Sequence, residues 1–142
     1  MRRHYSFSVP FVKGKGRPKF GHGHAYTPAA TERAEREVAR AFERAADEQV
    51  PNLDPMAPKG VPVRVAVATE RSVLSRWPKR AGDSHPDVQK PDLDNVVKLV
   101  LDGLNGHAWE DDAQVTDLHV IKKDRTRGAE ARTIVNVEWE DQ

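Results

Sequence analysis

The chain has 142 residues with a net charge of +1; 37% of them are hydrophobic, 32% are charged and none is cysteine. This length suits one domain with its own core, so we expect a single domain over residues 1–142. The lack of cysteine excludes disulfides, thiolate metal sites and cysteine nucleophiles. No apolar run approaches the ~20 residues of a membrane span, and polar residues interrupt the N-terminus where a signal peptide is apolar. We expect a cytoplasmic protein without a membrane partner.

The charges are distributed unevenly along the chain. No acidic residue precedes Glu32, and three basic groups flank a central acidic stretch. These groups are Arg2, Arg3, Lys13, Lys15, Arg17 and Lys19; then Arg71, Arg76, Lys79, Arg80 and Lys90; then Lys122, Lys123, Arg125 and Arg127. Basic flanks around an acidic centre suit a metal-dependent enzyme that acts on a polyanion. Dispersed, solvated surface charge is the alternative interpretation.

The N-terminal quarter predicts a strand and a loop. Residues 3–9 alternate between apolar and polar side chains, which is typical of a half-buried strand. Residues 10–28 are basic and rich in Gly and Pro, which indicates a loop or a loosely paired hairpin. The glycines would let backbone amides and basic side chains approach phosphates. We interpret His22 and His24 as exposed loop residues, because no matching ligand pair follows at metal-site spacing.

A helix follows this loop. Thr27 is expected to be its N-cap and Pro28 its first-turn residue, with Thr31 as an alternative cap. The helix should end near Asp47, because an apolar stripe runs that far, formed by Ala34, Val38, Ala41, Phe42 and Ala45.

The middle of the chain predicts a connector over residues 50–60 and the clearest strand over residues 61–68. Residues 71–78 could hold a short helix. Residues 79–90 have no periodicity, so we expect them to be mobile when nothing is bound. This basic loop could close over DNA, and a plain solvent loop is the competing interpretation.

A second helix is predicted over residues 93–104. Its apolar residues recur at helical spacing: Leu93, Val96, Val97, Val100, Leu101 and Leu104. Asp94, Lys98 and Asp102 run down another side at i, i+4 and i+8. We expect Gly103 and Gly106 to end the helix and turn the chain, which can bring an acidic group back towards the helix start.

The C-terminal part predicts strands over residues 115–123 and 133–139, which should form a hairpin. Trp109 should pack beneath the acidic turn that precedes them. The element order predicts an α+β, two-layer domain with a mixed four-stranded sheet and two main helices on one face. A sheet covered by two helices can leave an apolar face for a partner.

The two acidic groups around the second helix carry the chemistry. Asp92 and Asp94 lie at its start, and Glu110, Asp111 and Asp112 follow its end. Clustered carboxylates supply the hard oxygen ligands that Mg²⁺ or Mn²⁺ prefers, and Lys98 could offset charge on a phosphate or orient water. In the alternative interpretation, Asp92 and Asp94 cap the helix, and Asp94 with Lys98 is an ordinary surface pair.

The run DLDNVVKLVLDGLNG at residues 92–106, followed by WEDDAQV at 109–115, resembles the core motif of the RusA family of Holliday junction endonucleases. The segments GKGRPKF at 14–20 and AYTPAAT at 25–31 also resemble that family. The resemblance implies metal-binding acids at Asp92, Asp94 and Asp112 and a catalytic lysine at Lys98. It leaves the roles of Glu110, Asp111 and Asp102 open.

The resemblance also implies a function. We expect a Mg²⁺-dependent, structure-selective DNA endonuclease that resolves Holliday junctions by paired symmetric cleavage, in DNA recombination and repair. Mn²⁺ should substitute for Mg²⁺, no organic cofactor is needed, and the protein should act on four-way junctions as a homodimer. The host can be a bacterial cell, a phage or a prophage.

The expected DNA contacts are basic residues of the first two basic groups, namely Lys13, Lys15, Arg17, Lys19, Arg76, Lys79, Arg80 and Lys90. Two alternatives stay open: a metal-dependent nuclease acting on flaps, single strands or RNA, and a catalytically inactive DNA-binding relative. A third, a metal protein that does not act on nucleic acid, would leave the basic flanks unexplained.

Overall fold

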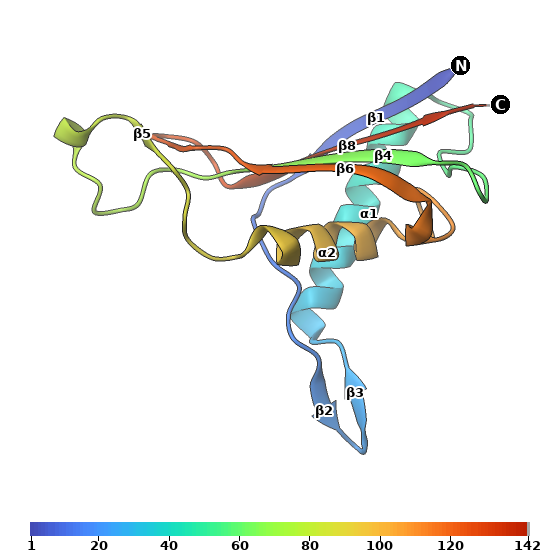
Figure 1. Ribbon diagram of the computed structural model, residues 1–142, viewed down its shortest axis with the longest axis horizontal. Helices are drawn as coiled ribbons and strands as arrows, with labels where there is room; N and C mark the ends of the chain where they lie inside the picture. Colours follow the sequence, from blue (N-terminus) through green and yellow to red (C-terminus); the bar gives the residue numbers. More distant parts are fainter. Residues whose placement is uncertain (142) are drawn as a thin grey trace.

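A computed structural model describes residues 1–141, and Figure 1 shows a sheet with helices packed on one side of it. Its elements in chain order are β1 Arg2–Val9, β2 Lys19–Gly21, β3 His24–Tyr26, α1 Ala29–Gln49, β4 Val63–Glu70, β5 Ser84–His85, α2 Leu93–Leu104, β6 Val115–Lys122, β7 Arg125–Thr126 and β8 Arg132–Glu140. Two short 3₁₀ helices, Lys79–Ala81 and Asp112–Gln114, precede β5 and β6. No helix within residues 1–141 is long and apolar enough to cross a membrane.

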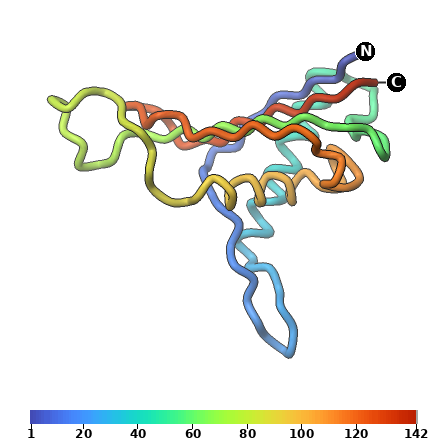
Figure 2. The backbone as a smooth tube through the Cα atoms, viewed as in Figure 1, coloured from blue at the N-terminus to red at the C-terminus, as the bar shows by residue number. Residues whose placement is uncertain are grey.

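The main sheet has four strands in the order β1-β8-β4-β6. β6 runs parallel to β4, whereas β8 is antiparallel to both β1 and β4, so the sheet is mixed. Both α1 and α2 lie on the same side of it (Figure 1). These features confirm the predicted α+β, two-layer fold. β1 and β8 lie side by side, and the Asp141 N–H donates to the Met1 carbonyl at 2.7 Å (Figure 2).

The core lies between the sheet and the helices because the strands alternate. Val63, Val65 and Val67 of β4 are at most 2% exposed, and they face the helices together with Tyr5 of β1. Phe42 of α1 packs edge-on against the Tyr5 ring at a centroid distance of 5.5 Å. Burial of these large apolar side chains supplies the main stabilisation of the two-layer packing.

The uncovered face of the sheet is more polar than expected. A depression of about 340 Å³ on this face is lined by His4, Arg64, Val65, Ala66, Asp117, His119, Asn136 and Glu138. The expectation of an apolar face is therefore wrong in its central part. Helices cover one side only, so the polar half of each alternating strand faces water.

The predicted hairpin between the last two main strands is also wrong. β4 lies between β6 and β8 and hydrogen-bonds with both. The chain leaves β4, crosses through α2 and returns parallel to β4 as β6, and such parallel pairs need a crossover helix. The chain after β6 then crosses β4 and forms β8 on the other side of it. Consecutive strands more often lie next to each other in a sheet.

The helix boundaries differ from expectation in two places. Pro28, not Thr27, occupies the N-cap of α1, and it makes no side-chain cap hydrogen bond. The buried Thr31 hydroxyl instead accepts a 3.1 Å hydrogen bond from the Gly16 N–H. Residues 71–78 form no helix. The Leu74 N–H donates to His85 Nε2 at 3.2 Å and not to a carbonyl of the preceding turn, as it would in a helix.

The two glycines at the end of α2 have different roles. Gly103 lies inside the helix, and a Cβ there would come within 2.9 Å of both the Glu35 carbonyl oxygen and the Val38 Cβ. Gly103 therefore permits the close crossing of α1 and α2 and does not end the helix. Gly106, with φ of 82°, makes the turn that follows, in a conformation that side chains other than glycine rarely adopt.

Part of the segment 79–90, which the sequence predicted to be mobile when nothing is bound, is anchored through Asp87. The Asp87 side chain is 1% exposed and is paired with Arg71 and Arg125. Burial by itself would raise the pKa of Asp87, but hydrogen bonds from Arg71 and the Gln89 amide and the charges of both arginines outweigh it. The pKa of Asp87 therefore lies below its ordinary value.

This lowered pKa predicts a loss of stability in acid. A carboxyl whose folded pKa is lowered stabilises the fold above its unfolded pKa, near 3.9, and this contribution disappears as the pH falls through the folded pKa. Asp87→Asn should therefore lower the free energy of unfolding most at pH 7, and this loss should be smaller at about pH 2, as measured by urea unfolding. Asp83→Asn is the control, because Asp83 is 84% exposed; it should change little at either pH. An equal loss at both pH values in Asp87→Asn would contradict the prediction.

Candidate active site

Two carboxylates and an ammonium at the start of α2 make few contacts with the rest of the protein. Asp92 is the N-cap residue, but its side chain makes no cap hydrogen bond, and its one ion pair is with exposed Lys90 at 3.5 Å. Asp94 and Lys98 are exposed, and within residues 1–141 neither side chain makes a hydrogen bond or ion pair. Of the alternative interpretation, Asp92 does occupy the N-cap and Asp94 the first turn, where negative charge complements the helix dipole, but the side-chain cap bond and the Asp94–Lys98 pair do not form among residues 1–141.

The acidic turn after α2 rests on a buried tryptophan. Trp109 is fully buried, and its Nε1–H donates a 2.7 Å hydrogen bond to Asp112 Oδ1. The prediction that Trp109 packs beneath the turn is confirmed. Asp111 has a different role, because its side chain caps the short 3₁₀ helix by accepting from the Ala113 N–H at 3.0 Å. Asp112 is thus oriented by Trp109, while Asp111 holds the backbone.

The environment of Asp112 is rich in negative charge. Burial raises the pKa of Asp112 above its ordinary value, and the nearby carboxylates of Asp102 and Asp111 raise it further. The Trp109 hydrogen bond and the Lys15 ammonium offset part of this effect. A carboxylate in such surroundings is stabilised by an additional cation.

Lys15 occupies a position that the sequence did not predict. Its ammonium hydrogen-bonds to Asp102 and, at 3.1 Å, to Glu35, so it bridges α2 and α1. Burial lowers the pKa of Lys15, but these two carboxylates outweigh burial and leave it raised. The Lys15 N–H also donates to the Asn95 carbonyl at 2.9 Å. Unlike the exposed Arg17 and Lys19, Lys15 is committed to contacts inside the protein.

Gly14 explains how this segment approaches α2. A Cβ on Gly14 would lie 3.0 Å from Cβ of both Asn95 and Pro91. The glycine therefore lets the backbone lie directly against the first turn of α2. The partnership of Lys15 with Asp102 spans 87 residues of sequence, and no local pattern signals it.

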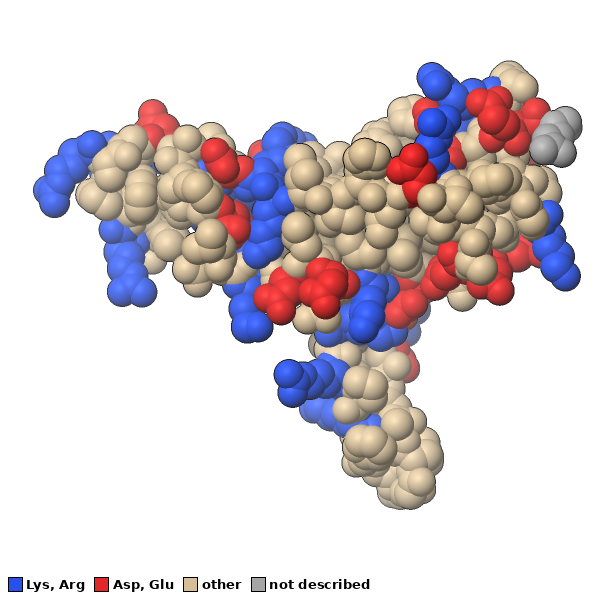
Figure 3. Space-filling view, viewed as in Figure 1, with Lys and Arg blue, Asp and Glu red and all other residues tan. Residues whose placement is uncertain are grey.

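Asp92, Asp94, Asp102 and Asp112, with Lys98 among them, form what we call the acidic strip. Asp94 and Asp102 are eight residues apart on one helix, which corresponds to about 12 Å along its axis. Asp112 lies within electrostatic range of Asp102. Within residues 1–141, no three acidic or histidine side chains already converge on one cation position. Figure 3 shows acidic and basic side chains next to each other on the α2 side of the molecule.

The predicted DNA contacts other than Lys15 are exposed. Lys13, Arg17 and Lys19 are exposed around the β2–β3 hairpin, which projects away from the sheet on the side of the helices (Figure 1). Arg76, Lys79 and Arg80 are exposed in the segment before β5, and Lys90 lies beside Asp92. The hairpin matches the expected loosely paired hairpin, and His22 and His24 are exposed on it as predicted.

Comparison with protein families identifies one match. The family model described as "Endodeoxyribonuclease RusA" matches residues 10–138. A search of curated proteins finds no match to the chain. The matched range contains the whole acidic strip, the β2–β3 hairpin and two of the four main strands, β4 and β6, together with most of β8. It covers most of the 142 residues, and the chain therefore belongs to the RusA family of endodeoxyribonucleases.

Proposed function

We propose that this endonuclease is Mg²⁺-dependent and structure-selective, and that it resolves four-way DNA junctions by paired symmetric cleavage. One observation carries the site assignment: Asp94 and Lys98 lie on a rigid helix without any partner among residues 1–141, and Asp92 makes only one exposed contact. Charged side chains that have no such partner in the described fold are available for a ligand. Family membership supports DNA as that ligand.

The donor chemistry of the carboxylates suits a hard divalent cation. Asp92, Asp94 and Asp112 would hold Mg²⁺, because carboxylate oxygens are its preferred protein ligands. The raised pKa of Asp112 and the Lys15 ammonium among Asp102 and Glu35 indicate surroundings that attract positive charge. When bound, the metal would supply Lewis-acid activation and charge neutralisation at the phosphodiester. Mn²⁺ should substitute, because it accepts the same ligands.

The remaining residues of the site have separable roles. Lys98 would stabilise negative charge that develops on the phosphate or orient the attacking water. Trp109 keeps one oxygen of Asp112 in a fixed hydrogen bond and so restricts its orientation. The exposed basic residues of the hairpin and of the segment before β5 would hold the phosphate backbone on either side.

The proposal is tested by offering equal amounts of a synthetic four-way junction, a flap, a single strand, an RNA duplex and a plain DNA duplex in Mg²⁺. Junction cleavage at symmetric positions, leaving ends that a ligase joins, is the expected result. Faster cleavage of flaps, single strands or RNA would favour the alternative nuclease. Binding of the junction without any cleavage in Mg²⁺ or Mn²⁺ would favour the inactive relative.

The exposed basic residues should contact phosphates, which predicts a salt effect. Neutralising both Arg17 and Lys19 should reduce the slope of log K against log salt by about two units, because each phosphate contact releases about one counterion. Arg44→Gln is the matched control: Arg44 is exposed on α1, 15 residues beyond its start and so about 22 Å along the axis from the hairpin. The control slope should not change. An unchanged slope in the double variant would exclude this segment from the DNA surface.

We also propose that the protein acts as a homodimer. A four-way junction has approximate two-fold symmetry and needs two cuts, whereas one chain carries one acidic strip. A C₂ dimer places two strips symmetrically about the crossover. Sedimentation should therefore give twice the chain mass of 15.9 kDa. On a cruciform plasmid, the wild type should linearise the DNA within one binding event, and a mixed dimer with one Asp112→Asn subunit should mostly nick it. A monomeric mass with single nicks would leave the nuclease standing and exclude paired resolution.

A further inference from the structure

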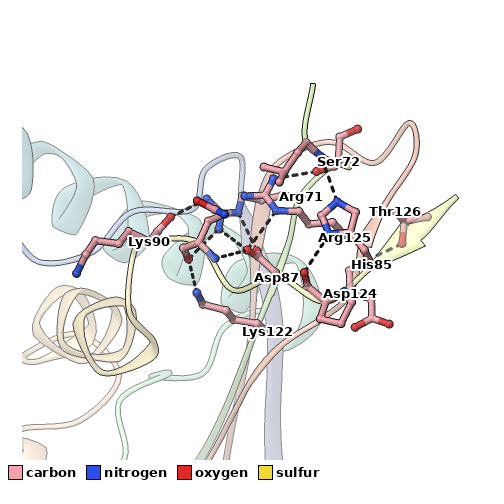
Figure 4. Close-up of polar contacts among 12 residues, drawn as sticks. Arg71, Ser72, His85, Asp87, Lys90, Lys122, Asp124, Arg125 and Thr126 are labelled. Carbon is pink, nitrogen blue, oxygen red and sulfur yellow. Dashed lines mark hydrogen bonds and ion pairs between the residues drawn. The ribbon is translucent and has the colours of Figure 1, made fainter. Parts of the chain in front are cut away.

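The segment that leads into α2 is held by a buried ion-pair network at the end of the sheet (Figure 4). Arg71, directly after β4, donates to both oxygens of Asp87: from Nε to Oδ2 at 2.9 Å and from Nη2 to Oδ1 at 2.7 Å. Arg125 of β7 adds a 3.2 Å hydrogen bond to Asp87 Oδ1. Two guanidinium groups thus neutralise one carboxylate that is almost inaccessible to water.

Arg71 also reaches beyond Asp87 towards α2. Its Nη1 donates to the Lys90 carbonyl at 3.0 Å, and its Nη2 contacts the Gln89 carbonyl at 3.3 Å. Lys122, the last residue of β6, donates to the same Gln89 carbonyl. The Gln89 and Lys90 carbonyls lie three and two residues, respectively, before Asp92, the first carboxylate of the acidic strip.

No apolar side chain of residues 86–90 anchors the segment. Among residues 86–90 only Asp87 is buried, and Val88 is 83% exposed. A planar guanidinium fixes its acceptors in both direction and distance, which a single apolar contact does not. Arg71 and Lys122 extend from the ends of the paired strands β4 and β6. Their polar contacts therefore fix the position of the segment relative to the sheet.

We propose that Arg71 is a positioning residue of the active site: its guanidinium, neutralised by Asp87, fixes the backbone at residues 89–90 and so sets where the Asp92 carboxylate lies. The inference rests on the proposed function, in which Asp92 is a metal ligand. Groups that orient a ligand from behind strongly influence how well the metal is held. Contacts from the end of the sheet would in this way influence how tightly Asp92, at the N-cap of α2, binds the metal.

Arg71→Lys tests this inference, because lysine keeps the positive charge near Asp87 but cannot hold the carboxylate and two carbonyls together. Mn²⁺ binding to the free protein, measured by calorimetry and by paramagnetic broadening of the Asp92 and Asp94 amide signals, should weaken about 10- to 100-fold. Amide exchange at residues 88–92 should accelerate. Cleavage should then need more metal for half-saturation but recover most of its rate at saturating metal.

Arg127→Lys is the matched control. Arg127 is another arginine of the same region and pairs with exposed Asp83 at 3.1 Å, but it does not contact residues 87–90. Its Mn²⁺ affinity should equal that of the wild type. If Arg71→Lys fails to fold, Lys122→Met replaces it, because that change removes only one contact to Gln89; it should weaken Mn²⁺ binding by a smaller but measurable factor of about three to ten.

The outcomes separate this inference from the proposed function. Unchanged Mn²⁺ affinity in a folded Arg71→Lys, with only a lower melting temperature, would show a purely structural network and overturn the inference even if the wild type resolves junctions. Weakened Mn²⁺ binding in Arg71→Lys would support the inference even if the wild type cuts no junction, provided that Asp92→Asn weakens Mn²⁺ binding too. Mn²⁺ binding that is indifferent to Asp92→Asn would overturn the inference.

Discussion

Asp112→Asn should cut a four-way junction in Mg²⁺ at least about a thousandfold more slowly than the wild type, while it binds the junction equally well or more tightly. Loss of a charged ligand removes several kcal/mol of metal-dependent stabilisation, and ~4 kcal/mol corresponds to this factor. Binding improves because a negative charge that faces the phosphates is removed. Single-turnover cleavage and a gel-shift titration in Ca²⁺ measure the two effects separately.

The structure makes this substitution a test of charge and not of folding. Asp112 Oδ1 accepts the Trp109 Nε1–H bond, and the carbonyl oxygen of an asparagine can accept the same bond. Asp111→Asn is the matched control, since Asp111 is exposed and asparagine also caps helices well; it should cut at nearly the wild-type rate. Asp92→Asn and Asp94→Asn should behave like Asp112→Asn. Near wild-type cleavage in any two of these three variants would show that the ligand assignment is wrong.

Lys98→Ala should slow cleavage by about a hundred- to a thousandfold with little loss of affinity, which is the usual effect of removing one group that stabilises transition-state charge. The competing expectation is a surface pair with Asp94, whose loss would cost a few tenths of a kcal/mol of stability and nothing in rate. No such pair forms among residues 1–141. Thermal unfolding of Lys98→Ala should therefore match that of the wild type.

The control for Lys98 must remove an exposed positive charge elsewhere. Arg44→Ala does so on α1, where the side chain is exposed, and it should leave both rate and stability unchanged. A normal cleavage rate in Lys98→Ala would establish that Lys98 is only a surface residue. A parallel fall in rate and junction affinity would instead assign Lys98 to DNA binding.

Local patterns in the sequence determined the elements that carry the site. The apolar repeat of residues 93–104 predicted α2 with its observed bounds, because apolar residues at helical spacing are a local signal that needs no tertiary contact to be recognised. Alternation predicted β1, β4 and β8 within one or two residues at each end. The motif in residues 92–115 also indicated the family that the family comparison shows. Each of these signals is contained within a short window of residues.

Only the tertiary structure decided how these elements meet. The position of β4 between β6 and β8 depends on which strand edges pair, and several pairings satisfy the same alternation. Lys15 bridges Asp102 and Glu35, and Arg71 joins Asp87 to the carbonyls before α2. Such polar partners are selected by distance and direction in the folded chain and not by sequence spacing. The sequence by itself therefore indicated the residues of the acidic strip. The fold determined which basic side chains contact the strip and the backbone that leads into it.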